Sequence, residues 1–233
     1  MDVYSPTWFG LFMDAIDAAQ TAREVEFLAR QLPLPRHVRV LDVCCGTGRH
    51  AAVLADRGYD VTGIDINRGA LARAREAIGT RASFLEHDMR RIEQLDGSFD
   101  AVLLLWQSFG QFDDATNLDV LRQIARKLAP GDRFILDIYH RGFFETRLGT
   151  RAHEKLGRTI TESKRLADDR LVVELDYGDG TGDRFEWRVF TPDEIAELSR
   201  QVGLRDVLRC ADFDESISPS PDRPRMQLVF EKQ

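Results

Sequence analysis

The sequence has 233 residues and a formal net charge of −7, with 43% hydrophobic and 30% charged residues. This length and balance fit one sizeable globular domain, or one domain with an added element. The negative charge disfavours nucleic acid as a partner, because a phosphate-binding surface is basic. The N-terminus lacks a basic start followed by an apolar core, and no apolar run approaches the length of a membrane span, so we expect a cytoplasmic protein without a membrane partner. Three cysteines are too few for a disulfide framework or a zinc site, and we predict no metal.

Residues 1–35 are predicted to form a helical cap or lid. Within this segment, apolar residues recur at helical spacing over 21–32. Thr21 with Glu24 three residues later is typical of a capping box, which makes Thr21 the predicted N-cap. Pro33 is predicted to end the helix.

From residue 36 to residue 142, strands and helices alternate. The run 99–106 is almost continuously apolar, as a strand buried on both faces requires. The alternation predicts an α/β fold with a doubly wound, mostly parallel sheet and helices on both faces. The predicted strands are 38–43, 59–65, 82–88, 99–106 and 133–139, and the predicted helices are 48–58, 68–79 and 117–131.

The pattern changes after residue 142. Residues 143–190 contain three strand-like runs, of which the last two are joined by a glycine-rich turn, so we predict a small antiparallel β insertion. Residues 191–233 return to the core with a helix, whose predicted capping box is formed by Thr191 and Glu194, and with two strands around a proline-rich loop. The three runs of the insertion are 155–166, 170–178 and 183–190.

The loop after the first predicted strand has a nucleotide-binding pattern. Gly46, Gly48 and Ala51 fit G-x-G-x-x-G/A between a strand and a helix. Glycines let the backbone turn tightly beside a ligand, and the helix N-terminus offers free N–H groups. Asp65 lies 17 residues beyond Gly48 at the end of the next strand, where a carboxylate can hold two ribose hydroxyls or, alternatively, cap a helix. The pattern predicts an adenosine-bearing cofactor, and the adjacent cysteines in the loop are incidental to it.

Two further carboxylates lie at strand ends. Asp42 comes just before the loop, where it would repel a pyrophosphate but suit a cationic ligand; alternatively it caps N–H groups of the loop. Asp88 ends the third strand, where it could accept a hydrogen bond from an adenine amino group with Met89 against the ring. The alternatives are a solvated acid and a core methionine.

In this order, the stretches "VLDVCCGTGRHA", "YDVTGIDIN", "FLEHDMR", "FDAVLLLWQSFG" and "GDRFILDIY" resemble the class I S-adenosylmethionine-dependent methyltransferases. The resemblance implies a Rossmann-like sheet of seven strands whose last strand runs antiparallel, with S-adenosylmethionine as cofactor and S-adenosylhomocysteine as product. It implies that Gly46 and Gly48 lie under the methionine part of the cofactor. It also implies that Asp65 holds the ribose and that Asp88 and Met89 flank the adenine.

The same resemblance extends the predicted cofactor contacts beyond these residues. The family usually has glycine where this chain has Cys44, so a side chain there is expected to narrow the pocket. The remaining predicted contacts are Asp42, Cys44, Ile66 and Leu105.

Ligands of open α/β sheets bind beyond the carboxyl ends of the parallel strands, so residues after the fourth and fifth strands should face a methyl acceptor. His140 is the candidate general base because histidine titrates near neutral pH; the alternative is a loop histidine without a role. The predicted acceptor-binding residues are Tyr4, Trp8, Trp106, Gln107, Ser108, Phe109, Tyr139, Arg141 and Trp187.

Two segments are expected to cover the site. Tyr4, Trp8 and Phe9 are predicted either to fold over the cofactor as a lid or to belong to a helix packed on the sheet. The insertion 143–190 is predicted to roof the acceptor site, with Trp187 on its apolar face, or simply to cover the sheet.

The sequence favours a methyltransferase that acts on a small-molecule acceptor by in-line transfer. Two alternatives stay open: an oxidoreductase that uses a nicotinamide dinucleotide, and a non-catalytic module that binds S-adenosylmethionine. The acidic charge favours a small acceptor over nucleic acid. The sequence leaves open whether the protein is a monomer or a homodimer.

Overall fold

Two β-sheets organise the structure, which is a computed structural model that describes residues 4–233. The larger sheet has seven strands in the order β10-β11-β5-β4-β1-β2-β3, and the smaller has four in the order β6-β7-β8-β9. The strands of the larger sheet are β1 (Arg39–Val43), β2 (Asp60–Asp65), β3 (Ser83–Glu86), β4 (Phe99–Leu104), β5 (Leu128–Tyr139), β10 (Leu204–Cys210) and β11 (Arg225–Lys232). The smaller sheet contains β6 (Gly149–Lys155), β7 (Arg158–Ala167), β8 (Arg170–Asp176) and β9 (Gly182–Arg188).

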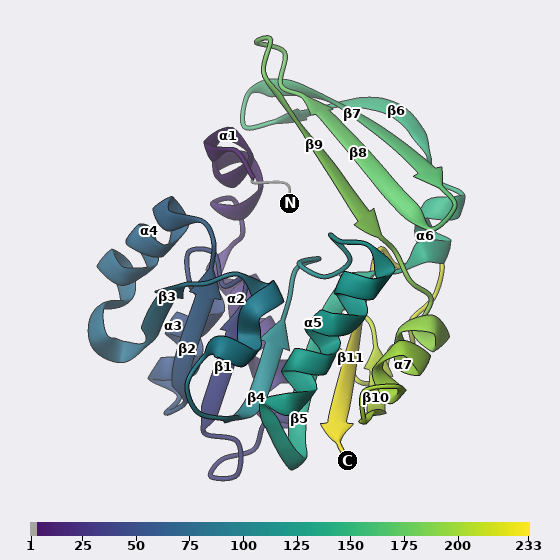
Figure 1. Ribbon diagram of the computed structural model, residues 1–233. Helices are drawn as coiled ribbons and strands as arrows, with labels where there is room; N and C mark the ends of the chain where they lie inside the picture. The colour runs from purple at the N-terminus through teal and green to yellow at the C-terminus, as the bar shows by residue number, and fades with distance from the viewer. Residues whose placement is uncertain (1–3) are drawn as a thin grey trace.

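The strand directions confirm the predicted mostly parallel sheet. Strand β1 pairs in parallel with β2 and β4, and the parallel run continues to β3 on one side and β5 on the other. The last strand, β11, runs antiparallel to both β5 and β10. Figure 1 shows the smaller sheet above the edge at which the parallel strands end.

Helices cover both faces of the larger sheet, as predicted. One core packs α2, α3 and α4 against the sheet, and the other packs α5 and α7 together with the 3-10 segment η3. Side chains of β4 alternate between the two cores, since Val102 and Leu104 belong to one and Ala101 and Leu103 to the other. The helices are α2 (Ala18–Gln31), α3 (Arg49–Asp56), α4 (Arg68–Ile78), α5 (Asp114–Arg126), α6 (Arg141–Glu145) and α7 (Pro192–Arg200), with η3 at Met89–Gln94.

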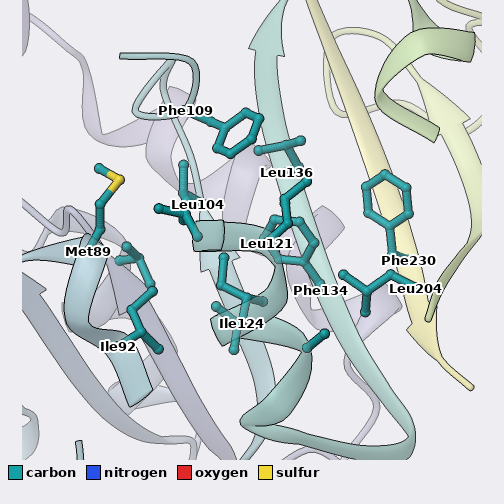
Figure 2. Close-up of a cluster of buried hydrophobic side chains, with 14 of the residues drawn as sticks. Met89, Ile92, Leu104, Phe109, Leu121, Ile124, Phe134, Leu136, Leu204 and Phe230 are labelled. Carbon is teal, nitrogen blue, oxygen red and sulfur yellow. The ribbon is translucent and has the colours of Figure 1, made fainter. Parts of the chain in front are cut away.

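Figure 2 shows the core on the α5 side. Leu121 and Ile124 of α5 lie between Leu104 of β4 and the ring of Phe134 in β5. Phe134 also stacks on Phe230 of β11, with ring centroids 5.6 Å apart. This close packing fixes the strand ends from which the site is built.

The insertion differs from the prediction by one strand. The predicted run 155–166 is split by a turn at Leu156 and Gly157, both at positive φ, into the end of β6 and most of β7. Strand β6 was missed because its residues are mostly exposed and polar, so they carry no apolar alternation. The predicted hairpin between β8 and β9 is confirmed.

The first long helix starts earlier than predicted. The side chain of Asp17 accepts a hydrogen bond from the Gln20 backbone N–H at 2.5 Å, so Asp17 is the N-cap and α2 begins at Ala18. Thr21 and Glu24 therefore lie inside the helix, where both are buried. The predicted capping box at Thr191 is confirmed.

The chain before α2 forms a short helix, α1 (Pro6–Trp8), and a π-helical turn, η1 (Phe9–Met13). Figure 1 shows α1 beside the smaller sheet, above the larger one. Tyr4 packs on Phe185 of β9 with ring centroids 4.7 Å apart, and Trp8 contacts the same ring. Within residues 4–233, no helix is long and apolar enough to span a membrane.

Candidate functional site

A first cavity lies beyond the carboxyl ends of β1, β2 and β4, where the sequence predicted a cofactor. Its wall includes residues from the glycine loop, from the loops after β2 and β4, and from the N-terminal segment. The predicted cofactor residues that line it are Asp42, Cys44, Gly46, Asp65, Ile66, Met89 and Leu105. Phe9, Thr47, Arg49, His50 and Ser108 line it as well.

The glycine loop is held by Asp65. One oxygen of this carboxylate accepts the Gly46 N–H at 2.8 Å, and the other accepts the Asn67 N–H at 2.8 Å. Burial raises the pKa of Asp65, and these hydrogen bonds oppose the rise. Asn67, not Asp65, caps α4. Because each carboxylate oxygen can accept more than one hydrogen bond, Asp65 can still face a ligand.

The two glycines of the loop serve different purposes. Gly46 has φ +55°, and a Cβ built there meets nothing closer than the Phe9 ring at 4.0 Å. Gly48 has φ +74°, and a Cβ there would lie 2.7 Å from Ile78 and 2.9 Å from Phe84. Gly48 does not line the cavity. It lets helix α3 pack close to the sheet, whereas Gly46 leaves room on the ligand side.

An acidic and a basic side chain at this cavity each have one buried atom without a hydrogen-bond partner. Among the described residues, the Asp42 Oδ2 and the Arg49 Nη2 have no hydrogen bond, although both side chains line the cavity. Burial raises the pKa of Asp42 to about 7; the nearby Arg49 lowers it and Asp65 raises it further. Unpaired buried polar groups are costly, so they indicate a ligand with an ammonium and a carboxylate. The amino-acid end of S-adenosylmethionine carries both groups.

Arg49 is oriented by Glu24 of helix α2. Its Nη1 donates to the Glu24 carboxylate at 2.6 Å and to the Thr21 hydroxyl at 3.0 Å. Glu24 also lies 2.7 Å from the His50 Nε2 and accepts from the Trp106 indole at 3.2 Å. Burial opposes ionisation of Glu24, but the His50 hydrogen bond and the Arg49 charge outweigh it and lower its pKa to about 2. Burial lowers the pKa of His50 to about 4, so His50 is a neutral donor.

Asp88 is placed differently from the prediction. Its carboxylate accepts from the Arg90 backbone and pairs with the Arg90 guanidinium at 2.5 Å. This hydrogen-bonded pairing lowers the pKa of Asp88, and the side chain does not line the cavity. Met89 does line the cavity and also packs in the core beside Ile92.

The adjacent cysteines are both partly buried free thiols. Burial raises the pKa of both Cys44 and Cys45, so both thiols stay protonated. Cys44 has φ +59° and lines the cavity, so its side chain occupies space that the glycine usual in the family would leave open. Cys45 packs against the core on the α3 side and also lines the cavity.

A second cavity of about 460 Å³ adjoins the first. Its walls come from the N-terminal segment, from the smaller sheet, and from the ends of β4 and β5. Tyr4, Trp8 and Trp106 line both cavities and mark their border. Of the predicted acceptor residues, Tyr4, Trp8, Trp106, Gln107, Tyr139 and Trp187 line the second cavity, and Ser108 lines the first.

The border residue Trp106 is held in an unusual backbone conformation. Trp106 and Gln107 both have positive φ, at 57° and 59°. The fully buried Asp137 accepts the Trp106 N–H at 2.9 Å and also pairs with Arg225. The guanidinium carbon atoms of Arg49 and Arg225 lie 4.6 Å and 4.2 Å from the Trp106 ring centroid. The indole is thereby fixed where the cavities meet.

Besides Gly48 and Asp88, three predicted residues line neither cavity. His140 is buried beside Gly142, its Nδ1 has no partner among the described residues, and burial lowers its pKa. Phe109 belongs to the core, where Figure 2 shows it near Leu136. Arg141 pairs with Glu194 at 2.7 Å. His140 and Arg141 stand where the chain turns from β5 directly into α6, and neither lines a cavity, so the role of His140 as a base stays a prediction without support from the geometry.

Comparison with known proteins identifies the chemistry. Residues 40–131 match the family described as a methyltransferase domain. YqeM of Bacillus subtilis (strain 168), provisionally described as a methyltransferase, is 28% identical over 214 residues, which cover 85% of this chain and 86% of YqeM. Together with the fold, these matches support a class I S-adenosylmethionine-dependent methyltransferase, whose methyltransferase domain includes residues 40–131. Its cofactor is S-adenosylmethionine, and the dinucleotide alternative is set aside.

Solved structures agree with this methyltransferase in fold. An S-adenosylmethionine-dependent methyltransferase from Clostridium acetobutylicum ATCC 824 superposes with a TM-score of 0.81 at 15% identity, over 97% of this chain and 96% of that one. The amino pentose methyltransferase CalS10 from Micromonospora echinaspora, bound to its cofactor, superposes with a TM-score of 0.74 at 19% identity, over 100% of this chain and 99% of that one.

Glu24 and Arg49 are site residues that the sequence patterns do not predict. Arg49 directly follows Gly48 and so stands at the N-terminus of a helix, where a positive charge is unfavourable. Its position therefore indicates a negatively charged partner or ligand nearby. The spacing of Thr21 and Glu24 predicts a capping box, which gives no indication of a site role for Glu24. Its contact with Arg49 depends on how α2 packs against α3, which spacing alone does not reveal.

Proposed function

We propose that this methyltransferase transfers the methyl group to a small-molecule acceptor held in the second cavity. The observation that carries the proposal is the shared border, where Tyr4, Trp8 and Trp106 face both cavities. A cavity of about 460 Å³ suits a small molecule. The resemblance in fold to CalS10, whose name describes an amino pentose methyltransferase, supports a small acceptor.

The residues of the first cavity would hold the cofactor by its polar ends. In our proposal, Arg49 pairs with the methionine carboxylate, Asp42 with the ammonium, and Asp65 with the ribose hydroxyls. Met89 and Ile66 would contact the adenosine. The bound cofactor supplies a methyl group activated by a positively charged sulfur.

The chain's own contribution would be placement and exclusion of water. The N-terminal segment 1–35 would act as a lid, and the insertion 143–190 would cover the acceptor. Transfer from a sulfonium to a neutral or anionic nucleophile disperses charge, so in-line positioning in a closed site is the main requirement. Trp106, fixed by Glu24 and Asp137, would set the wall along which the two reactants meet.

Two measurements test this function. Calorimetry should show binding of S-adenosylmethionine and S-adenosylhomocysteine, and labelled methyl groups should enter a component of a metabolite extract. Asp65→Ala should weaken cofactor binding by about 100-fold, because it removes two loop hydrogen bonds and the ribose contact. Asp60→Ala is the matched control, since Asp60 is exposed at the start of the same strand.

The outcomes separate the alternatives. Cofactor binding without transfer into any extract would favour a non-catalytic binding module. Failure to bind either compound, with Asp65→Ala behaving like wild type, would refute the assignment of the first cavity.

A further inference from the structure

The second cavity has an unbalanced charge. Four charged side chains line it: Lys155, Glu162, Lys164 and Arg225. Lys164 and Glu162 neutralise each other at 2.6 Å. Arg225 pairs with the buried Asp137 through its Nε at 3.1 Å. The ammonium group of Lys155 has no ion pair within residues 4–233, so the lining has a surplus of one positive charge.

Lys155 is held toward the cavity by an aromatic contact. Its Nζ lies 4.7 Å from the ring centroid of Phe12, which lines the same cavity from the N-terminal segment. Lys155 ends strand β6 and is partly buried, unlike the exposed residues before it in the strand. A partly desolvated ammonium without a carboxylate favours an anionic ligand.

The surroundings offer an apolar seat and one further donor. Phe143, Phe144, Phe185 and Trp187 line the cavity. The hydroxyl of Tyr139 has no hydrogen-bond partner among the described residues. Burial raises the pKa of Tyr139 to about 12, so the hydroxyl remains a donor at neutral pH.

We propose that the methyl acceptor has an apolar or aromatic body and an anionic group, and that Lys155 is the residue that recognises the anion. This inference rests on the proposed function, because it assigns the second cavity to the acceptor. A carboxylate, sulfate or phosphate would each meet the surplus charge, and the aromatic walls would bury the body. The Glu162 carboxylate stays neutralised by Lys164 and does not repel such a ligand.

Two dyes that differ in one charge test the proposal. Dansylglycine has a carboxylate on an aromatic body, and dansylglycinamide is its neutral counterpart. Each dye is titrated into the protein saturated with S-adenosylhomocysteine, as wild type, Lys155→Met, Lys155→Arg and Lys232→Met. Lys232 lies at the end of β11 and lines neither cavity, so Lys232→Met is the matched charge control.

We expect Lys155→Met to lower the affinity for dansylglycine by about tenfold and the affinity for dansylglycinamide by less than about twofold. Lys155→Arg and Lys232→Met should keep wild-type affinity for both dyes. Three outcomes would each overturn the proposal. Wild type and Lys155→Met could bind dansylglycine equally well, Lys155→Met could lose the same affinity for both dyes, or wild type could fail to bind dansylglycine.

Calorimetry of the same variants with S-adenosylhomocysteine separates this inference from the proposed function. If cofactor affinity is normal but both dyes bind wild type and Lys155→Met equally well, only the proposal of an anionic acceptor is refuted. If wild type binds neither S-adenosylmethionine nor S-adenosylhomocysteine, the proposed function itself fails.

Discussion

The two cavities of this methyltransferase are built in different ways. The cofactor cavity is formed largely by loops that directly follow β1, β2 and β4, and its polar groups are fixed by hydrogen bonds such as those of Asp65. The second cavity, which we propose holds the acceptor, is assembled from the N-terminal segment, the smaller sheet and the ends of β4 and β5. The first depends on local chain order and the second on long-range packing. Substitutions that strain the backbone on the cofactor side should therefore be strongly destabilising. The N-terminal segment at the second cavity should change its dynamics when a ligand binds.

The largest expected effect tests the rigidity of the cofactor side. Gly48→Ala places a Cβ against Ile78 and Phe84 at φ +74°, so we expect a loss of about 3 kcal/mol in the free energy of unfolding. Gly97 has the same φ, and nothing lies within 4 Å of a Cβ built there. Gly97→Ala should therefore cost only about 1 kcal/mol. Urea denaturation measures both, and equal losses would show that packing at Gly48 is unimportant.

A second prediction concerns the charge of the cofactor cavity. Asp42 has a pKa of about 7, so it is ionised in about a tenth of the molecules at pH 6 and in about nine-tenths at pH 8. The ammonium of S-adenosylhomocysteine requires the ionised form, so its affinity should rise about tenfold from pH 6 to pH 8. Calorimetry across this range checks the slope. In Asp42→Asn the rise should disappear; a persisting rise would point to another group.

The N-terminal segment tests whether the two sides communicate. Tyr4 and Trp8 border both cavities, so S-adenosylhomocysteine should stabilise 6–13 and slow its amide hydrogen exchange by several-fold. The hairpin turn 177–181 lines neither cavity and serves as the internal control. Unchanged exchange in 6–13 would mean that this segment is a fixed wall and not a lid.

The smallest effect is expected at Cys44. Cys44→Gly removes a side chain from a position at φ +59°, where glycine is favoured, but it also loses packing against the core. These changes oppose each other, so cofactor affinity should change by less than about threefold. A larger gain in affinity would show that the thiol narrows the cavity.

The same contrast explains what could be predicted from the sequence. The parallel core, the glycine loop and Asp65 follow from periodicity and spacing, because consecutive strands end at one edge of the sheet. The pairing of Asp88 with the nearby Arg90 could not be predicted from spacing, and the adenine contact of Asp88 stays a prediction. The position of His140 outside both cavities depends on the turn from β5 directly into α6, which the sequence pattern does not reveal. Strand β6, and with it Lys155, gave no apolar pattern to recognise.

The position of the tryptophans has a practical consequence. The chain contains three tryptophans, and all of them, Trp8, Trp106 and Trp187, line the second cavity. They lie on three separate segments that come together only in the folded protein. The tryptophan emission of the whole protein therefore originates around this cavity and its border with the first, so quenching by an acceptor is measured with S-adenosylhomocysteine already bound. A search for the natural acceptor can follow quenching of that emission, without any label on the compounds being screened.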